Sequence, residues 1–263
     1  MAQITVNTVI REGQIKYEDG SVEWYVGGKL HRDDGLPAVE CADGTKKWYI
    51  NGRLQRDEGL PAIEYADGGR EWYIGGKRNR DGDLPSIVHA NGTNEWYMNG
   101  RLHRDGDLPS VECADGTKKW YKNGKLQRDS GLPAVEYSSG TKVWYMNGNR
   151  HRDDGLPAVV YSDGTMQWYI RDKPHRDGDI PAIKYANGSE AWYVQGKRHR
   201  DGGLPAVVLA NGDNEWYAQG KRHRDGGLPA VVLADGTEEW WINGVNRSEE
   251  YGKSVQKFQR GFA

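Results

Sequence analysis

Tryptophan recurs along this chain with a period of 24 residues, each time within the same local pattern of apolar and polar positions. A fixed period of this length is typical of stacked repeats, and it overrides a domain count based on chain length. We therefore expect a single array without internal domain boundaries. The column consists of Trp24, Trp48, Trp72, Trp96, Trp120, Trp144, Trp168, Trp192, Trp216 and Trp240.

The unit from residue 45 to 68, TKKWYINGRLQRDEGLPAIEYADG, predicts antiparallel strands that follow one another in chain order. It begins with aromatic and β-branched residues, and Asn51–Gly52 is a strong signal for a two-residue β-hairpin. Residues 57–59 break the regularity, residues 60–65 form another extended stretch, and Asp67–Gly68 turns into the next unit. Each unit is therefore expected to contain a hairpin and a return strand.

A proline column predicts where the return strand is kinked. Proline lacks the backbone donor of a strand ladder and is confined to strand starts, edges and bulges, so it excludes a continuous helix at this step. The column consists of Pro37, Pro61, Pro85, Pro109, Pro133, Pro157, Pro181, Pro205 and Pro229.

The period of two along a strand predicts which side chains face inward. We expect the core layer of each repeat to contain the equivalents of Trp48, Ile50, Ile63 and Tyr65. Tyr49 points to the opposite face, where a second, thinner layer with Leu60 is expected.

The two ends depart from the unit, as the caps of a stacked array should. Residues 1–23 are expected to form an N-terminal cap and half repeat, with a strand over residues 4–10. Residues 24–239 form nine repeats, and residues 240–263 form a partial repeat and a C-terminal cap. One apolar helical face predicts a short capping helix over the last tryptophan, with a membrane-surface or partner-docking helix as the alternative. That face consists of Tyr251, Val255, Phe258 and Phe262.

Composition and charge exclude some partner classes. With 36 basic and 38 acidic residues, the net charge of −2 provides no global field for nucleic acid or an anionic membrane.

Cys41 and Cys113 lie three repeats apart, about 29 Å at strand spacing, and are expected to be free thiols. Residues 1–10 contain no continuous apolar segment, so no signal peptide or membrane span is expected. The expected location is the cytoplasm.

The unit resembles the MORN repeat and its bacterial and viral variants, over about residues 15–244. The resemblance lies in the period and in the order aromatic residue, Asn-Gly, basic residue, His, Gly, apolar strand and Asp-Gly. The best matches are Trp48, Asn51–Gly52 and Asp67–Gly68, or Trp96, Asn99–Gly100, His103 and Asp115–Gly116. The chain departs from the family because Arg and Asp follow the His column and Leu-Pro is added. The resemblance implies a recognition or scaffolding module, in some members one that contacts lipid head groups, of the kind found in large DNA viruses, phages and bacteria.

The His-Arg-Asp triplet is the main candidate for chemistry. A kinase would use it as a catalytic loop, but the other kinase motifs are absent. Gln55, Asn79 and Gln127 replace the histidine in three units, and all three can still donate and accept hydrogen bonds. Such exchanges fit a bonding role rather than catalysis or metal ligation. The candidate binding surface consists of His31, Arg32, His103, Arg104, His151, Arg152, His175, Arg176, His199, Arg200, His223 and Arg224.

The Arg-Asp steps support two interpretations. In the first, each arginine pairs with a neighbouring aspartate at the kink and forms a structural ladder. In the second, some guanidinium groups stand free beside His and Tyr and bind a phosphate-bearing ligand. Asp-rich turns do not match a calcium-binding spacing, and no catalytic, metal or cofactor-binding constellation is expected.

The sequence therefore predicts an all-β, elongated array of antiparallel β-hairpins, on the order of 85 Å long, with a short C-terminal capping helix. The expected function is non-enzymatic protein binding, as a viral or phage factor that binds and inhibits a host protein in the host cytoplasm. The alternatives are the binding of nucleotides or phosphoinositides by the Arg and His columns, and a structural protein that self-associates through the array ends.

Overall fold

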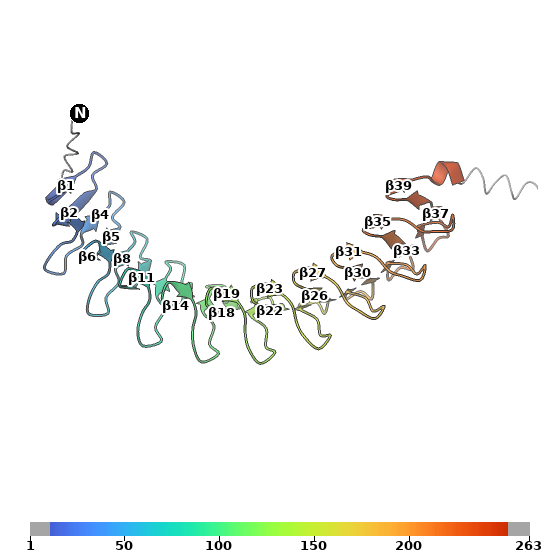
Figure 1. The fold of residues 1–263 in the computed structure, drawn as a ribbon, viewed down its shortest axis with the longest axis horizontal. Helices are drawn as coiled ribbons and strands as arrows, with labels where there is room; N and C mark the ends of the chain where they lie inside the picture. The colour runs from blue at the N-terminus through green and yellow to red at the C-terminus, as the bar shows by residue number, and fades with distance from the viewer. Residues whose placement is uncertain (1–10, 252–263) are drawn as a thin grey trace, which may run out of the picture. The chain divides into compact units, whose positions relative to one another are not determined.

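The computed structural model describes residues 11–251 of the chain. Within this range the chain is almost entirely antiparallel β-structure with one short C-terminal helix, which confirms the expected fold class. It divides into two compact units, Met1–Lys125 and Leu126–Ala263, each built from the same repeated element (Figure 1). The expected strand over residues 4–10 and the helical positions Val255, Phe258 and Phe262 lie outside the described residues.

Each repeat contributes two short sheet strands and one two-stranded hairpin. The N-terminal half repeat contains β1 (Gly13–Lys16), β2 (Val22–Val26) and β3 (Lys29–Leu30). The strands that follow each proline are β4 (Val39–Glu40), β8 (Ile63–Glu64), β12 (Ile87–Val88), β16 (Val111–Glu112), β20 (Val135–Glu136), β24 (Val159–Val160), β28 (Ile183–Lys184), β32 (Val207–Val208) and β36 (Val231–Val232). The strands that precede each tryptophan are β5 (Lys46–Lys47), β9 (Arg70–Glu71), β13 (Asn94–Glu95), β17 (Lys118–Lys119), β21 (Lys142–Val143), β25 (Met166–Gln167), β29 (Glu190–Ala191), β33 (Asn214–Glu215) and β37 (Glu238–Glu239).

Each hairpin begins directly after a tryptophan, and its second strand follows the two-residue turn. They are β6 (Tyr49–Ile50), β7 (Arg53–Leu54), β10 (Tyr73–Ile74), β11 (Lys77–Arg78), β14 (Tyr97–Met98), β15 (Arg101–Leu102), β18 (Tyr121–Lys122), β19 (Lys125–Leu126), β22 (Tyr145–Met146), β23 (Asn149–Arg150), β26 (Tyr169–Ile170), β27 (Lys173–Pro174), β30 (Tyr193–Val194), β31 (Lys197–Arg198), β34 (Tyr217–Ala218), β35 (Lys221–Arg222), β38 (Trp241–Ile242) and β39 (Val245–Asn246).

The sheet strands pair in chain order within each compact unit. Ile63 in β8 lies opposite Lys47 in β5 on one side and Glu71 in β9 on the other, and this register recurs from repeat to repeat. The second unit repeats the arrangement from β20 to β37. Every return strand is therefore held by the strand before it and the strand after it.

The tryptophan marks the point where the chain passes from the sheet into the hairpin. The Trp48 N–H donates to the Ala62 carbonyl at 2.8 Å, and the Trp48 carbonyl accepts from Gln55 at 3.1 Å. The hairpin itself closes at Asn51–Gly52, where φ is 51° and 77° as the predicted two-residue turn requires. The extended segment before Asn51–Gly52 is thus two short strands, β5 and β6, separated by Trp48.

The expected core layer is only partly correct. The seven tryptophans from Trp48 to Trp192 are at most 8% exposed, and Ile63 is 7% exposed, but Tyr65 is 39% exposed and Ile50 is half-exposed. Ala62, which is fully buried, completes the layer instead. Its N–H donates to the Glu71 backbone carbonyl, and its own carbonyl accepts from the Trp48 backbone N–H, so the backbone lies between two neighbours and leaves room only for a small side chain.

The expected second layer with Leu60 is wrong. Leu60 is 42% exposed, because the loop of residues 57–60 carries it out of the sheet before Pro61 returns the chain to the core. A column that looks like core in the sequence is therefore a surface column.

The two described ends differ from the repeat unit, and the C-terminal one confirms the predicted short helix. The strands β1 and β2 pair as a hairpin, with Gln14 opposite Trp24. At the other end a helix begins at residue 248, and Tyr251 stacks on Trp240 with ring centroids 6.2 Å apart. Ser248 occupies the slot that holds arginine in the preceding repeats, so the tyrosine ring covers the last indole.

Cys41 and Cys113 are free, as expected from their separation. Within residues 11–251, no helix combines the length and the apolar character that crossing a membrane requires.

Candidate functional site

The arginine of each triplet covers the outer face of its own tryptophan. The guanidinium carbon of Arg56 lies 3.8 Å from the Trp48 ring centroid, and its Nη1 donates to the Pro61 carbonyl at 3.5 Å. Stacking of this kind, with the cation over the indole face, contributes on the order of 0.5–2 kcal/mol. The same stacking distance, 3.7–3.9 Å, is found at Arg32, Arg80, Arg104, Arg152, Arg176, Arg200 and Arg224.

Several of these arginines also pair with a carboxylate. Arg56 contacts Glu64, eight residues further along, at 3.0 Å, and Arg32 contacts its equivalent Glu40 at 3.1 Å. Arg104 holds Asp83 of the preceding loop with two bonds of 2.8 and 2.9 Å, and these bonds lower the pKa of the Asp83 carboxyl. The predicted pairing with an aspartate at the kink is therefore present at Arg104, and it recurs between Arg200 and Asp179.

Four arginines form no hydrogen bond or ion pair with a carboxylate among the described residues, although the charge of Glu238 acts on one of them, Arg224. The slot eight positions further along holds Val or Lys in these repeats instead of Glu. Burial against the tryptophan lowers the pKa of each of these guanidinium groups. The hypothesis of an anion-binding arginine thus applies within residues 11–251 to Arg80, Arg152, Arg176 and Arg224.

The histidine column ties the loop of one repeat to the hairpin turn of the next. His31 Nε2 lies 3.1 Å from Asp33 Oδ1, and the Asn51 backbone N–H donates to His31 Nδ1 at 3.3 Å. The proton is therefore on Nε2, since Nδ1 must accept. The same pair of bonds holds His103, His175 and His223.

Glutamine reproduces this arrangement in two of the exceptional units. Gln55 Nε2 donates to Asp57 at 3.3 Å, and its Oε1 accepts from the Gly75 backbone N–H at 2.9 Å. An amide offers a donor and an acceptor at opposite ends, as the neutral imidazole does. The structure thus gives most of the predicted His and Arg site residues a bonding role within or between repeats, whereas the buried His199 Nδ1 has no hydrogen-bond partner among residues 11–251.

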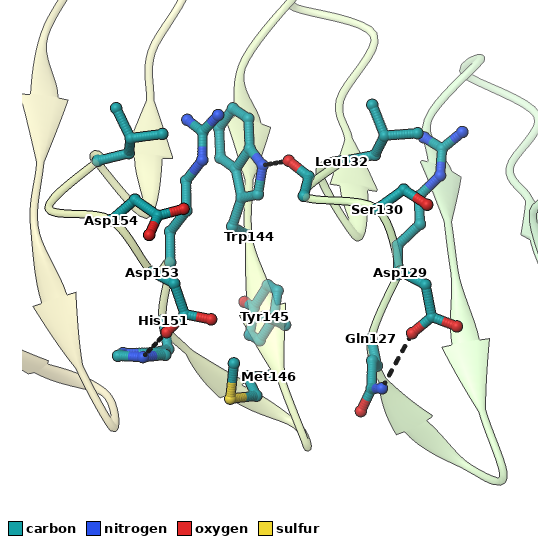
Figure 2. Close-up of a pocket in the computed structure, with 14 residues that line it drawn as sticks. Gln127, Asp129, Ser130, Leu132, Trp144, Tyr145, Met146, His151, Asp153 and Asp154 are labelled. Atoms are coloured by element: carbon teal, nitrogen blue, oxygen red, sulfur yellow. Dashed lines mark hydrogen bonds and ion pairs between the residues drawn. The ribbon is translucent and has the colours of Figure 1, made fainter.

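The bonded His or Gln side chains and the loops line a hollow between consecutive repeats, which we call a loop notch. The Trp144 notch has a volume of about 430 Å³ and lies between the loops of residues 129–132 and 153–156. Figure 2 shows Trp144 and Tyr145 between these loops, with Met146 at the hairpin end. The Trp144 indole N–H donates to the Gly131 carbonyl at 2.8 Å, which fixes the ring against the first loop (Figure 2).

The notch recurs in the other compact unit. The Trp48 notch, of about 570 Å³, lies between Leu36 and Leu60, and the Trp72 notch, of about 280 Å³, lies between Leu60 and Leu84. The loop residue before each proline, Leu in eight repeats and Ile in one, is between 40% and 50% exposed. This leucine column consists of Leu36, Leu60, Leu84, Leu108, Leu132, Leu156, Ile180, Leu204 and Leu228.

Sequence reasoning did not find the leucine column as a surface feature. The signal was present, because the leucine stands between an Asp-rich loop and a proline and does not continue the alternation of a strand. Only the loop geometry shows that the side chain points out of the sheet.

No family model matches the sequence, and no curated protein matches it. Within the part of the chain that the structure describes, no group of three His, Cys, Asp or Glu side chains is arranged to hold a metal ion.

Proposed function

We propose that this chain is a non-enzymatic repeat scaffold that binds another protein through its row of loop notches. The observation that supports this proposal most directly is the leucine column, in which one apolar side chain per repeat is 40–50% exposed beside a hollow. Single exposed leucines are common, but an apolar column of this regularity marks an interaction surface. The MORN-like resemblance supports a viral or phage factor that binds and inhibits a host protein.

The energetics fit a partner that contacts several notches at once. Complete burial of a leucine side chain stabilises a complex by about 1.5–3 kcal/mol relative to full exposure, so a half-exposed one contributes about 1 kcal/mol. One notch by itself supports only weak binding, because association costs entropy, whereas several notches together bind tightly. The repetition of the notch is therefore part of the proposed mechanism.

The test uses the two leucines of the Trp144 notch. We expect Leu132→Ser with Leu156→Ser to reduce capture of a specific protein from a host lysate by at least about tenfold, measured by affinity capture and quantitative mass spectrometry. Tyr137→Ser with Tyr161→Ser is the matched control, because these rings are 43% and 39% exposed in the same repeats but do not line the notch. Equal loss in both variants, or in neither, would contradict the proposal.

A second candidate function is the binding of a phosphate-bearing ligand, which the four arginines without a carboxylate partner favour. Calorimetry with nucleotides and phosphoinositide head groups tests it. If the arginines bind phosphate, Arg152→Ala and Arg176→Ala should abolish binding. Arg104→Ala should retain it, because Asp83 and Glu112 already occupy the Arg104 guanidinium. The remaining alternative, self-association through the array ends, gains no support at the C-terminal end, where Tyr251 covers Trp240.

A further inference from the structure

The Trp48 notch combines an apolar floor with an acidic rim. Leu36 and Leu60 stand on its two sides, and Trp48, Tyr49 and Ile50 line the space between them. This lining can accept an aliphatic or aromatic side chain of a partner.

Four carboxylates belong to the two loops of this notch, and all are exposed. Asp33 is held by His31, with its side chain still 79% exposed, and Asp57 is held by Gln55. Asp34 and Glu58 accept no hydrogen bond from any residue between 11 and 251. Beside the hollow, two carboxylates thus accept a hydrogen bond from a side chain of the same loop, and two accept none among residues 11–251.

The cations beside the notch do not balance this charge. Arg32 pairs with Glu40 and Arg56 pairs with Glu64, both outside the notch lining. The Trp144 notch differs, because Arg152 has no carboxylate partner in the described chain and Ser130 stands in the slot of Glu58. The excess of negative charge is thus greater at the Trp48 notch.

We propose that the Trp48 notch binds a cationic, amphipathic polypeptide segment of the partner. An apolar side chain of the segment lies between Leu36 and Leu60, and flanking Lys or Arg side chains pair with Asp34 and Glu58. The apolar contact supplies most of the affinity. The charges select the partner, because the carboxylates of the notch repel acidic segments. This proposal rests on the proposed function and names the chemistry of its partner.

The experiment measures two labelled probe peptides by fluorescence anisotropy with the full chain. One peptide alternates leucine and lysine, and the other alternates leucine and glutamate. We expect the lysine peptide to bind at least about tenfold more tightly, and its affinity to fall as salt is added. The doubly substituted chain with Asp34→Asn and Glu58→Gln should bind the lysine peptide about tenfold more weakly, because both isosteric changes remove charge and retain shape.

The control variant combines Glu238→Gln and Glu249→Gln. It removes the same net charge at exposed positions that do not line the Trp48 notch. Retained binding in the control supports a local site. Equal loss in both double variants overturns the proposal, because net charge alone would then explain binding.

Two further outcomes separate this proposal from the proposed function. If both peptides bind equally and Leu36→Ser with Leu60→Ser abolishes both, the notch binds protein without charge selection and the cationic partner is wrong. If light scattering shows self-association that Asp34→Asn with Glu58→Gln removes, the occupant is a second copy of this chain and the proposal is overturned. Capture through Leu132 and Leu156 is measured independently of either result.

Discussion

The side chains of the triplet divide three structural tasks between them. Arg104 covers the Trp96 indole, His103 joins its own loop to the next hairpin turn, and Asp105 accepts a hydrogen bond from the imidazole N–H. These structural contacts are sufficient to explain why the triplet recurs from repeat to repeat. The bonding pattern also explains why an amide can replace the imidazole.

The first prediction concerns this histidine. Replacing it with leucine leaves Asp105 and the Asn123 N–H without their partner, whereas glutamine supplies both bonds. We expect His103→Leu to lower the free energy of unfolding by about 1–2 kcal/mol and His103→Gln to change it by less than about 0.5 kcal/mol. Urea denaturation measures both. Equal losses would show that the ring packs rather than bonds.

The second prediction concerns a buried carboxylate on another face of the repeat. Glu71 is 5% exposed and accepts hydrogen bonds from Tyr73 at 2.6 Å, Tyr65 at 2.8 Å and Arg78 at 2.9 Å. Burial and the bond to Glu71 raise the pKa of both Tyr65 and Tyr73 to about 12. Because the folded state holds these protons more tightly, their contribution to stability is complete below the unfolded pKa of about 10 and is lost as the pH rises through about 12.

The measurement is the phenolate absorbance during an alkaline titration. In the native chain, Tyr65 and Tyr73 should ionise about two pH units above free tyrosine, together with other tyrosines of raised pKa such as Tyr17. Tyr73→Phe should remove one of these late-ionising groups. A titration in which Tyr73→Phe leaves the late phase unchanged would contradict the assignment.

At the scale of the element, the two-residue hairpins are nearly uniform, and one of them departs. Its turn holds Arg171 and Asp172 at φ of 49° and 64°, so both residues adopt a left-handed conformation without glycine. This conformation costs roughly 1–2 kcal/mol for an ordinary residue. Asp172 offsets the cost, because its Oδ1 accepts from the Arg150 N–H at 3.1 Å and from Arg150 Nε at 2.9 Å.

The third prediction separates the two effects at this turn. Asp172→Ala loses the bonds and keeps the unfavourable backbone, so we expect the free energy of unfolding to fall by about 2 kcal/mol. Asp172→Gly loses the same bonds but relieves the backbone, so its loss should be about 1 kcal/mol smaller. Urea denaturation of both variants measures the difference. An equal loss would show that the backbone is not strained.

At the scale of the whole molecule, the repeat makes stability a sum over neighbours. Among residues 11–251, sheet strands pair in chain order, and where a histidine bonds to another repeat it reaches the following hairpin. Such a chain should tolerate the loss of a complete period, since the new neighbours present the same register.

The fourth prediction is a deletion of residues 189–212, which joins Gly188 to Asp213 in the same phase of the repeat. We expect the shortened chain to keep its β-structure by circular dichroism, with an unfolding m-value lower by about a tenth. Deletion of residues 189–200 is the control, because it joins half a unit to a whole one and should prevent folding beyond the junction. Folding of both, or of neither, would contradict the neighbour model.

The local sequence was sufficient to predict several particular features. Asn51–Gly52 predicted its hairpin, Pro61 predicted the kink, and the tryptophan period predicted the buried column, because each depends on backbone preferences or on a strict repeat. Leu60 and Tyr65 were assigned to the core wrongly, since burial depends on where a loop carries a side chain. The limits of the caps at residues 23 and 240 remain predictions.

The candidate site could be anticipated only as a set of residue types. The sequence singled out Arg152 and His151, but the bonds that decide their availability run to Trp144 and Asp153 and to the next hairpin. The loop notch itself was not foreseen, because its walls come from two repeats.

The amino-acid sequence alone determined the period, the order of strands and turns, and the antiparallel class of this protein. These follow from side-chain alternation and from the φ angles that Asn, Gly and Pro prefer, which act over a few residues. Only the tertiary structure decided that Ala62 is buried, that Leu60 is exposed and that some arginines lack a carboxylate. These depend on contacts between successive repeats, where distance in space and not position in the unit determines the partner of each side chain.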